Sequence, residues 1–82
     1  MKYDVRITPR AEKDYRDIPL PFRTNIYRKI MAMEDGLQGD VKRLTYFDPP
    51  YRLRVGDYRV LFDVEDQEIV IYRILHRKES YR

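Results

Sequence analysis

The chain has no cysteine and no tryptophan, and it holds one histidine and three glycines in 82 residues. The absence of cysteine excludes a disulfide framework and a cysteine-based metal site, and one histidine argues against a histidine metal centre. Three glycines are too few for a glycine-rich phosphate loop, and the GxGxxG, P-loop and HExxH motifs are absent. We therefore expect neither a nucleotide nor a metal cofactor.

Long apolar runs are missing as well. No stretch approaches the roughly 18 residues of a membrane span, and the N-terminus lacks the apolar core of a signal peptide. We expect a cytoplasmic protein without membrane contact that forms a single domain, residues 1–82. Hydrophobic content of 43% is enough for a packed core. A chain of this size buries only about 60% of its unfolded surface, so a stabilising partner would be unsurprising.

The charged residues are segregated, although the net charge is only +3. Glu65, Asp66 and Glu68 group at an expected turn, whereas residues 73–82 hold four cations against one glutamate. A mild net charge argues against a protein that coats nucleic acid indiscriminately. It permits a focused phosphate site.

The N-terminal half is expected to contain a strand and two helices. Alternating apolar residues predict a strand at 3–7, and Thr8-Pro9 supplies a cap and a first-turn proline for a short helix. Pro19-Leu20-Pro21 ends that helix. A longer second helix follows, with apolar residues at spacings of three and four: Phe22, Ile26, Ile30, Met33 and Leu37.

The C-terminal half is expected to be a meander of three strands. The stretch 40–50 is interpreted as a connector, and strands are predicted at about 51–55, 58–64 and 68–75. Gly56-Asp57 suits a two-residue hairpin. The whole is an α+β fold, in which an N-terminal strand, a two-helix hairpin and a three-stranded antiparallel meander pack together with the helices on one face of the sheet.

This hairpin would gather arginines on the other face of the sheet. If Gly56 and Asp57 form the turn, Arg54 lies opposite Arg59, and alternation places Arg52 beside them. Like charges directly opposite cost roughly 0.2–1 kcal/mol, a cost that a bound anion would relieve. Guanidinium forks match phosphate oxygens and can stabilise the charge of a phosphoryl transition state.

Plainer interpretations remain open for each of these groups. The arginines can line a solvated face and pair with carboxylates such as Asp57 or Asp63. His76 can act as an acid or base near neutral pH, and Tyr81 can stack on a base or donate through its hydroxyl. Each of these two residues also has an ordinary structural explanation.

Three segments together resemble the RelE/ParE toxin superfamily. They are residues 3–11, residues 51–62 and residues 74–82, and with the intervening helical hairpin the resemblance covers essentially the whole chain. It implies a sheet carrying an N-terminal helical hairpin and an antitoxin that wraps the toxin. For RelE-like members it also implies ribosome-dependent, metal-independent cleavage of mRNA in the A site, with the 2'-hydroxyl as nucleophile and a 2',3'-cyclic phosphate as product.

The resemblance also assigns site residues. Arg52 and Arg54 stand where RelE carries two lysines, and Arg59, Arg77 and Tyr81 match its strand arginine, later arginine and C-terminal tyrosine. Arginine does not readily lose a proton, so Arg52 and Arg54 are expected to stabilise charge, and His76 is the candidate proton carrier. Contact with RNA or ribosome is expected from four further cations: Lys42, Arg43, Arg73 and Lys78.

The expected function is therefore that of a type II toxin, an mRNA endonuclease that acts on the ribosome and forms a hetero-oligomer with a RelB-like antitoxin. The alternative is a ParE-like toxin that inhibits DNA gyrase, which has no need of the arginine and tyrosine constellation. A third possibility is a toxin-like fold that has lost its activity and serves as a binding partner.

Overall fold

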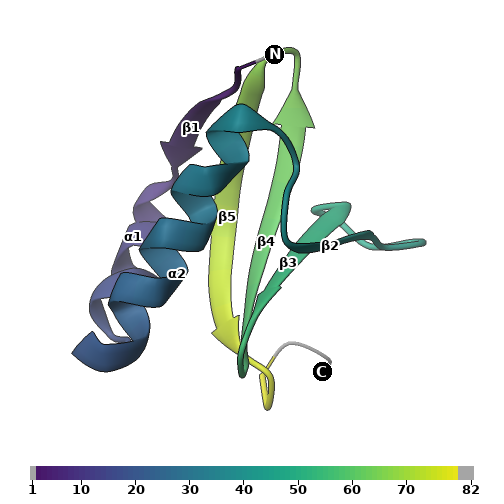
Figure 1. Cartoon of the computed structure of the whole chain (residues 1–82). Coiled ribbons are helices and arrows are strands. Elements are labelled where there is room, and N and C mark those ends of the chain that lie inside the picture. Colours follow the sequence, from purple (N-terminus) through teal and green to yellow (C-terminus); the bar gives the residue numbers. More distant parts are fainter. Residues whose placement is uncertain (1, 80–82) are drawn as a thin grey trace.

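A computed structural model describes residues 2–79 and contains a five-stranded sheet in the order β1-β5-β4-β3-β2. The helices lie together on one face of this sheet (Figure 1). The elements follow one another along the chain as β1 (Asp4–Ile7), α1 (Pro9–Arg16), α2 (Leu20–Ala32), the 3-10 turn η1 (Met33–Asp35), β2 (Asp40–Arg43), β3 (Tyr51–Val55), β4 (Tyr58–Glu65) and β5 (Glu68–His76).

The helical hairpin is set by its caps and prolines. The Thr8 hydroxyl accepts a hydrogen bond from the Ala11 amide at 3.3 Å, and Pro9 occupies the first turn, as expected for the start of α1. Pro19 is the N-cap residue of α2. Two nitrogens of Arg23 donate to the Ile18 carbonyl at 3.2 and 3.1 Å, which fixes the corner between the helices.

The β3–β4 hairpin has the predicted turn and register. Gly56 adopts a φ of 59°, a left-handed conformation that favours glycine, and Val55 pairs with Tyr58. Strand β5 is antiparallel to β4, whereas β1 is parallel to β5. The expected α+β arrangement of a strand, two helices and an antiparallel meander is therefore confirmed.

The segment 40–43 was interpreted as part of a connector, and this is wrong. It forms the edge strand β2, which pairs antiparallel with β3. One apolar residue, Val41, among three charged ones gives this strand almost no hydrophobic signal, so its pairing partner decides its structure. Gly39 enters it with a φ of 93°, and a Cβ there would lie 3.2 Å from Leu53 Cδ1.

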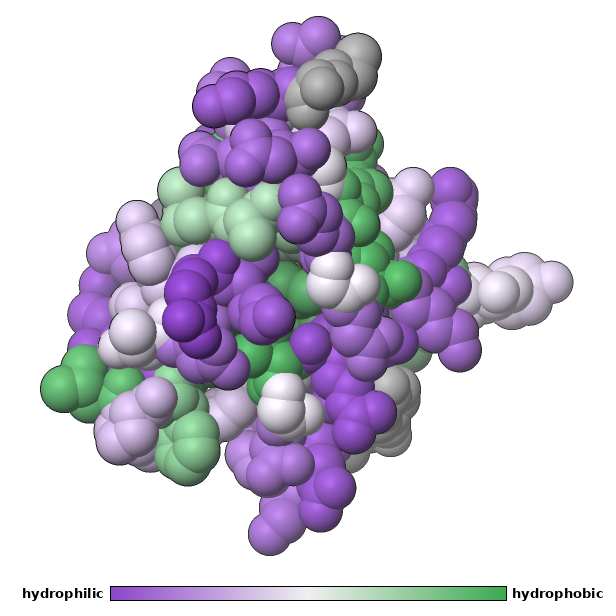
Figure 2. All heavy atoms as spheres, viewed as in Figure 1, coloured by the Kyte–Doolittle hydropathy of each residue, from purple (hydrophilic) through white to green (hydrophobic). Residues whose placement is uncertain are grey.

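The main core lies between the helices and the sheet. Its buried side chains come from both layers: Ala11, Ile18, Ile26, Ile30, Met33, Leu53, Val55, Val60, Phe62, Ile69, Ile71 and Ile74. Of the apolar stripe predicted for the second helix, Ile26, Ile30 and Met33 are buried and Phe22 is exposed. The helix ends at Ala32, so Leu37 lies beyond it and is also exposed. Figure 2, seen from the helical side, shows apolar surface at the corner between the helices, where Leu20 and Phe22 are exposed.

Strand β5 contains an irregularity that places its apolar residues in this core. Leu61 pairs with Arg73 and Phe62 with Ile71, so Tyr72 is an extra residue in β5. This bulge turns Ile71 and Ile74, three residues apart, toward the same layer of helices. No helix of the described residues is long and apolar enough to cross a membrane.

Candidate nucleic-acid interface

Four neighbouring cations of β2, β3 and β4 lie on the face of the sheet that points away from the helices, which we call the open face. Arg54 pairs with Arg59 across β3 and β4, and Lys42 pairs with Arg52 across β2 and β3. Directly paired residues project from the same side of a sheet, and successive rows are two residues apart. These four residues form the arginine face; the structure thus brings together the predicted Arg52, Arg54 and Arg59 and adds Lys42.

The arginine face is partly ordered by its surroundings. The Arg52 side chain is only 11% exposed, and its Nη1 lies 3.7 Å from Asp40 Oδ1. One guanidinium nitrogen of Arg59, Nη1, is shielded from solvent, whereas Arg54 is exposed. A cation already held in place loses less conformational entropy when it binds an anion. The sequence does not predict Asp40 as a partner of Arg52, because it does not predict β2.

Arg77 follows the last strand at the hairpin end of the sheet. Its amide donates to the Asp57 carbonyl at 2.7 Å, and its Nε lies 3.8 Å from the carboxylate Oδ1 of Asp57. Asp57 belongs to the turn between β3 and β4, three residues after Arg54 and two before Arg59. The predicted fourth arginine therefore lies at the same end of the sheet as the Arg54–Arg59 pair.

His76 projects from the other face. It pairs with Tyr58, whose ring it meets edge-on with centroids 5.3 Å apart, and its Nδ1 accepts a hydrogen bond from the Lys78 amide at 3.3 Å. A hollow of about 220 Å³ is lined by His76, Tyr58, Phe22 and the turn residues Gly56 and Asp57. His76 thus shares the hairpin end of the sheet with Arg77, but the arginine face lies on the opposite side.

The other predicted contacts are distributed over the molecule. Arg43 lies on the helical side of β2, with its guanidinium 5.6 Å from the centre of the Tyr51 ring. Lys78 is exposed in the turn after β5. Tyr81 lies outside the described residues.

Arg73 is held by the first helix. Its Nε and Nη2 donate to Asp14 at 2.7 and 3.3 Å, and the Ile74 amide donates to the same carboxylate at 3.0 Å. The hydrogen bond to Asp14 raises the pKa of the Arg73 guanidinium above its ordinary value. Asp14 therefore joins α1 to β5, and Arg73 has a structural partner that its position in a basic segment did not predict.

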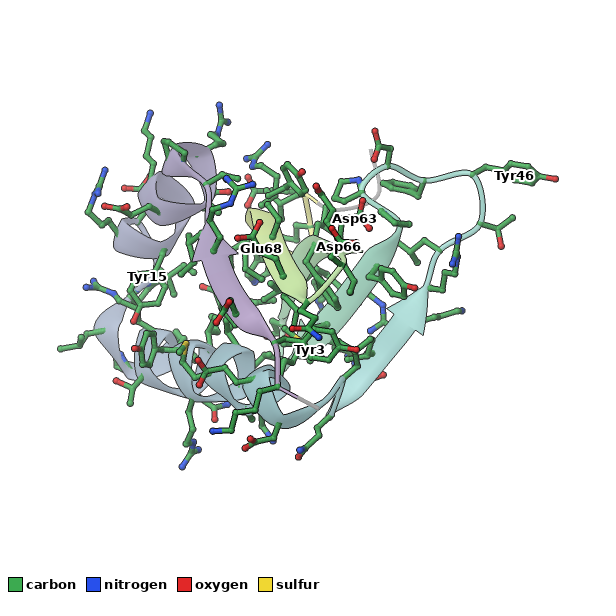
Figure 3. The ribbon with its side chains drawn as sticks, turned by 90° about the horizontal axis from the view of Figure 1, so that it is seen from above. Tyr3, Tyr15, Tyr46, Asp63, Asp66 and Glu68 are labelled. Carbon is green, nitrogen blue, oxygen red and sulfur yellow. The ribbon has the colours of Figure 1, made fainter. Side chains whose placement is uncertain are left out.

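The opposite end of the sheet is acidic. Figure 3 shows Asp63, Asp66 and Glu68 gathered near the turn between β4 and β5, and Glu65 pairs with Glu68. The predicted segregation of charge is thus a polarity of the molecule, with carboxylates at one end of β4 and the Arg54–Arg59 pair at the other. A polyanion would be attracted to the arginine face and repelled from the turn between β4 and β5.

These features define a class of small α+β domains that carry a helical hairpin on one face of the sheet and cations on the other. The sequence model of the family described as "ParE toxin of type II toxin-antitoxin system, parDE" matches residues 5–81. Toxin RelE3 of Methanocaldococcus jannaschii is 32% identical over 74 residues, which cover 84% of each chain. A second protein of that organism, putative toxin RelE1, is 32% identical over 88 residues and covers all of this chain and 98% of its own.

Solved structures show the same fold. The toxin chain of the RelB-RelE antitoxin-toxin complex from Methanococcus jannaschii has a TM-score of 0.79 at 29% identity, covering 93% of this chain and 94% of its own. The RelBE2 toxin-antitoxin complex from Mycobacterium tuberculosis has a TM-score of 0.81 at 24% identity, with 94% and 100% covered. The chain belongs to the RelE/ParE superfamily of type II toxin-antitoxin toxins.

Proposed function

We propose that this toxin is a RelE-like endoribonuclease that cleaves mRNA in the ribosomal A site. The observation that carries the proposal is the direct pairing of Arg54 with Arg59 on the open face, next to Arg52 and Lys42. Pairing of like charges is unfavourable for the isolated fold, and a phosphodiester bound there would reverse the sign of the interaction. Both curated relatives carry the RelE name.

The proposed reaction needs no cofactor. The 2'-oxygen of the nucleotide bonds to the adjacent phosphorus while the bond from phosphorus to the 5'-oxygen breaks. The 2'-hydroxyl loses its proton to a base, the 5'-oxygen gains a proton, and a 2',3'-cyclic phosphate remains. Charge accumulates on the phosphoryl oxygens in the transition state, where Arg54, Arg59 and Arg77 would supply hydrogen bonds and positive charge.

Proton transfer is assigned to His76, and positioning to Tyr81 and Arg52. Guanidinium groups keep their protons, so the arginine face serves electrostatics and not base catalysis. His76 lies at the end of β5, beside the turn residue Asp57 that also contacts Arg77. Because the arginine face lies on the other side of the sheet, His76 would transfer a proton to or from a substrate that reaches around this end of the sheet. Tyr81 would stack on or orient the nucleotide.

Ribosomal RNA contacts are proposed for the remaining cations. Lys42 on β2 and Lys78 in the turn after β5 are both exposed, so both are available to phosphates. Arg43 contacts Tyr51 and Arg73 contacts Asp14. These two arginines would bind RNA only through the guanidinium atoms that these contacts leave accessible. A protein that acts on translating ribosomes would work in the cytoplasm.

An antitoxin of the RelB type is the proposed protein partner, in a toxin-antitoxin hetero-oligomer. The similar structures from Methanococcus jannaschii and Mycobacterium tuberculosis are complexes of this kind. The helical hairpin offers a suitable surface, because Leu20, Phe22 and Tyr27 are exposed on it. An apolar hollow of about 230 Å³ between the helices is lined by Ile7, Glu12, Tyr15, Tyr27 and Ile30.

A ParE-like inhibitor of DNA gyrase is the alternative, and the description of the matching family model favours it. The paired arginines favour the nuclease, since binding to a protein target does not require a cluster of like charges on one sheet face. One experiment separates the two. The chain is expressed briefly in a translating extract, new 5' ends are mapped on a reporter message, and gyrase supercoiling is assayed in parallel.

Ribosome-dependent cuts at fixed codon positions, with gyrase unaffected, are the expected result. Arg28→Gln is the matched control for substitutions of the arginine face, because Arg28 is an exposed arginine on α2. Its Nη2 donates to Asn25 Oδ1 of the same helix at 2.8 Å. Intact message together with inhibited supercoiling would replace the nuclease assignment by the gyrase one.

A further inference from the structure

A loop with two aromatic side chains connects β2 to β3. Its neck is closed by the Leu44 amide, which donates to the Pro50 carbonyl at 2.6 Å. We call residues 44–50 the aromatic loop. Tyr46 at its tip is 101% exposed, and Phe47 is also exposed. Figure 3 shows the Tyr46 ring projecting away from the rest of the molecule.

The backbone at the tip is not the one that tyrosine prefers. Tyr46 has a φ of 60°, in the left-handed region that glycine and asparagine adopt more easily. Such conformations carry a free-energy cost and persist where the surrounding structure enforces them. Packing of the Tyr46 side chain does not offset this cost, because the whole ring faces solvent. A bound partner would use the ring.

The loop adjoins the arginine face. The Lys42–Arg52 pair lies two residues from the neck on each strand, and the four steps from Pro50 to Arg54 span about 13 Å. Asp48 and Pro49 of the loop line a hollow of about 290 Å³ with Tyr72 of β5. A strand of RNA whose phosphate lies on the arginine face thus has its neighbouring nucleotides within reach of the loop.

We propose that Tyr46 is a stacking platform for an unpaired RNA base next to the nucleotide held by the arginine face, with Phe47 as its neighbour. The inference rests on the proposed endonuclease function and adds a base-binding element to it. Aromatic rings beside a cationic track are the usual means of holding single-stranded nucleic acid. The rings would therefore set which nucleotide is cut, by fixing the position of the strand on the arginines.

The surroundings favour RNA over a protein as the occupant. Two cations flank the neck of the loop, Lys42 on the open face and Arg43 on the helical side. The loop itself presents two rings at a tip and no continuous apolar patch, whereas the exposed apolar side chains suited to a protein lie on the helices, at Leu20, Phe22 and Tyr27.

The test uses two substitutions at one position of the full chain. Tyr46→Asn removes the ring but suits the left-handed backbone, and Tyr46→Phe keeps the ring. Binding is measured by fluorescence anisotropy with a short single-stranded RNA that carries a 2'-deoxy nucleotide at the cleavage position. We expect Tyr46→Asn to weaken binding about 5- to 100-fold and Tyr46→Phe to stay within about 2-fold. Arg28→Gln, which changes an exposed side chain of α2 far from the loop in the sequence, should leave binding unchanged.

An abasic scan of the same RNA locates the contact. At the stacked position, removal of the base should cost wild type as much affinity as Tyr46→Asn does, and the two losses should not add. Equal affinity of wild type and Tyr46→Asn, with binding still dependent on Arg54, would overturn the stacking role alone. Loss of antitoxin binding with RNA binding intact would make the loop a protein contact. Absence of RNA binding and cleavage by wild type, including on programmed ribosomes, would overturn both this inference and the proposed function.

Discussion

Arg54 and Arg59 lie directly opposite each other on β3 and β4, two rows from the Gly56-Asp57 turn. Their side chains share the open face, and Arg52 of the next row lies diagonal to Arg59. A pair of like charges in this position works against the stability of the hairpin and in favour of any anion that binds there. Stability and function therefore make opposite demands on one residue pair.

Arg54→Gln should separate these two demands. Removal of one charge relieves the repulsion, so the free energy of unfolding should rise by about 0.2–1 kcal/mol, measured by urea denaturation. Cleavage of message should fall about 100-fold or more, because one donor to the transition state is lost. Arg28→Gln should change neither quantity by a comparable amount. A variant with lower stability and full cleavage activity would contradict the role given to the pair.

Asp14→Asn should weaken the attachment of α1 to the sheet. The Asp14 side chain is 13% exposed and accepts hydrogen bonds from Arg73 and from the Ile74 amide. Loss of its charge should lower the free energy of unfolding by about 1–3 kcal/mol, as chemical denaturation would measure. Glu12→Gln is the control, since the exposed Glu12–Arg16 pair should contribute no more than about 0.5 kcal/mol. Equal losses of unfolding free energy in the two variants would show that Asp14 does not hold α1 to β5.

The arginine face could be predicted from the sequence because local chemistry determines it. Gly56-Asp57 selects a two-residue turn, the turn fixes the register, and the register places Arg52, Arg54 and Arg59 on one side. Lys42 could not be placed beside them, because β2 has too few apolar residues to be recognised and forms only against β3.

The surroundings of β5 depended on tertiary structure. The bulge at Tyr72 shifts the alternation of this strand by one residue, so the faces of its C-terminal residues do not follow from its start. His76 consequently faces the helical side beside Tyr58, whereas Arg73 pairs with Leu61 and still donates to Asp14 of α1. Asp14 is half-buried, whereas Glu12 and Asp17 in and beside the same short helix are exposed. No pattern in the sequence distinguishes these carboxylates from one another.

The pKa of Tyr72 should be raised by its contact with Glu65. Its hydroxyl donates to Glu65 Oε2 at 3.1 Å, and this hydrogen bond, followed by desolvation, raises the pKa of Tyr72 above its ordinary value near 10. Stability from this contact is fully present below the unfolded pKa and is lost as pH rises through the folded one. Alkaline difference absorbance of wild type against Glu65→Gln should show one tyrosine shifted to lower pH by the substitution. Superimposable titrations would exclude the hydrogen bond in solution.

His76→Asn tests proton transfer separately from structure. The asparagine side-chain oxygen can take the place of Nδ1 as acceptor for the Lys78 amide, so the turn after β5 should persist, with thermal unfolding close to wild type. Asparagine does not titrate near neutral pH. If His76 carries a proton in the reaction, cleavage should fall about 100-fold or more, and the pH–rate profile should lose the limb that this proton carrier contributes.

The shape of that profile decides what His76 does, whatever the size of the loss. A lower rate with an unchanged pH dependence would mean that the ring only packs against Tyr58 and supports the hairpin end of the sheet. Tyr58→Phe is the matched control, because it keeps the ring that His76 contacts and removes only a hydroxyl. This variant should retain both the rate and the pH profile, so that a change confined to His76→Asn identifies the imidazole as the titrating group.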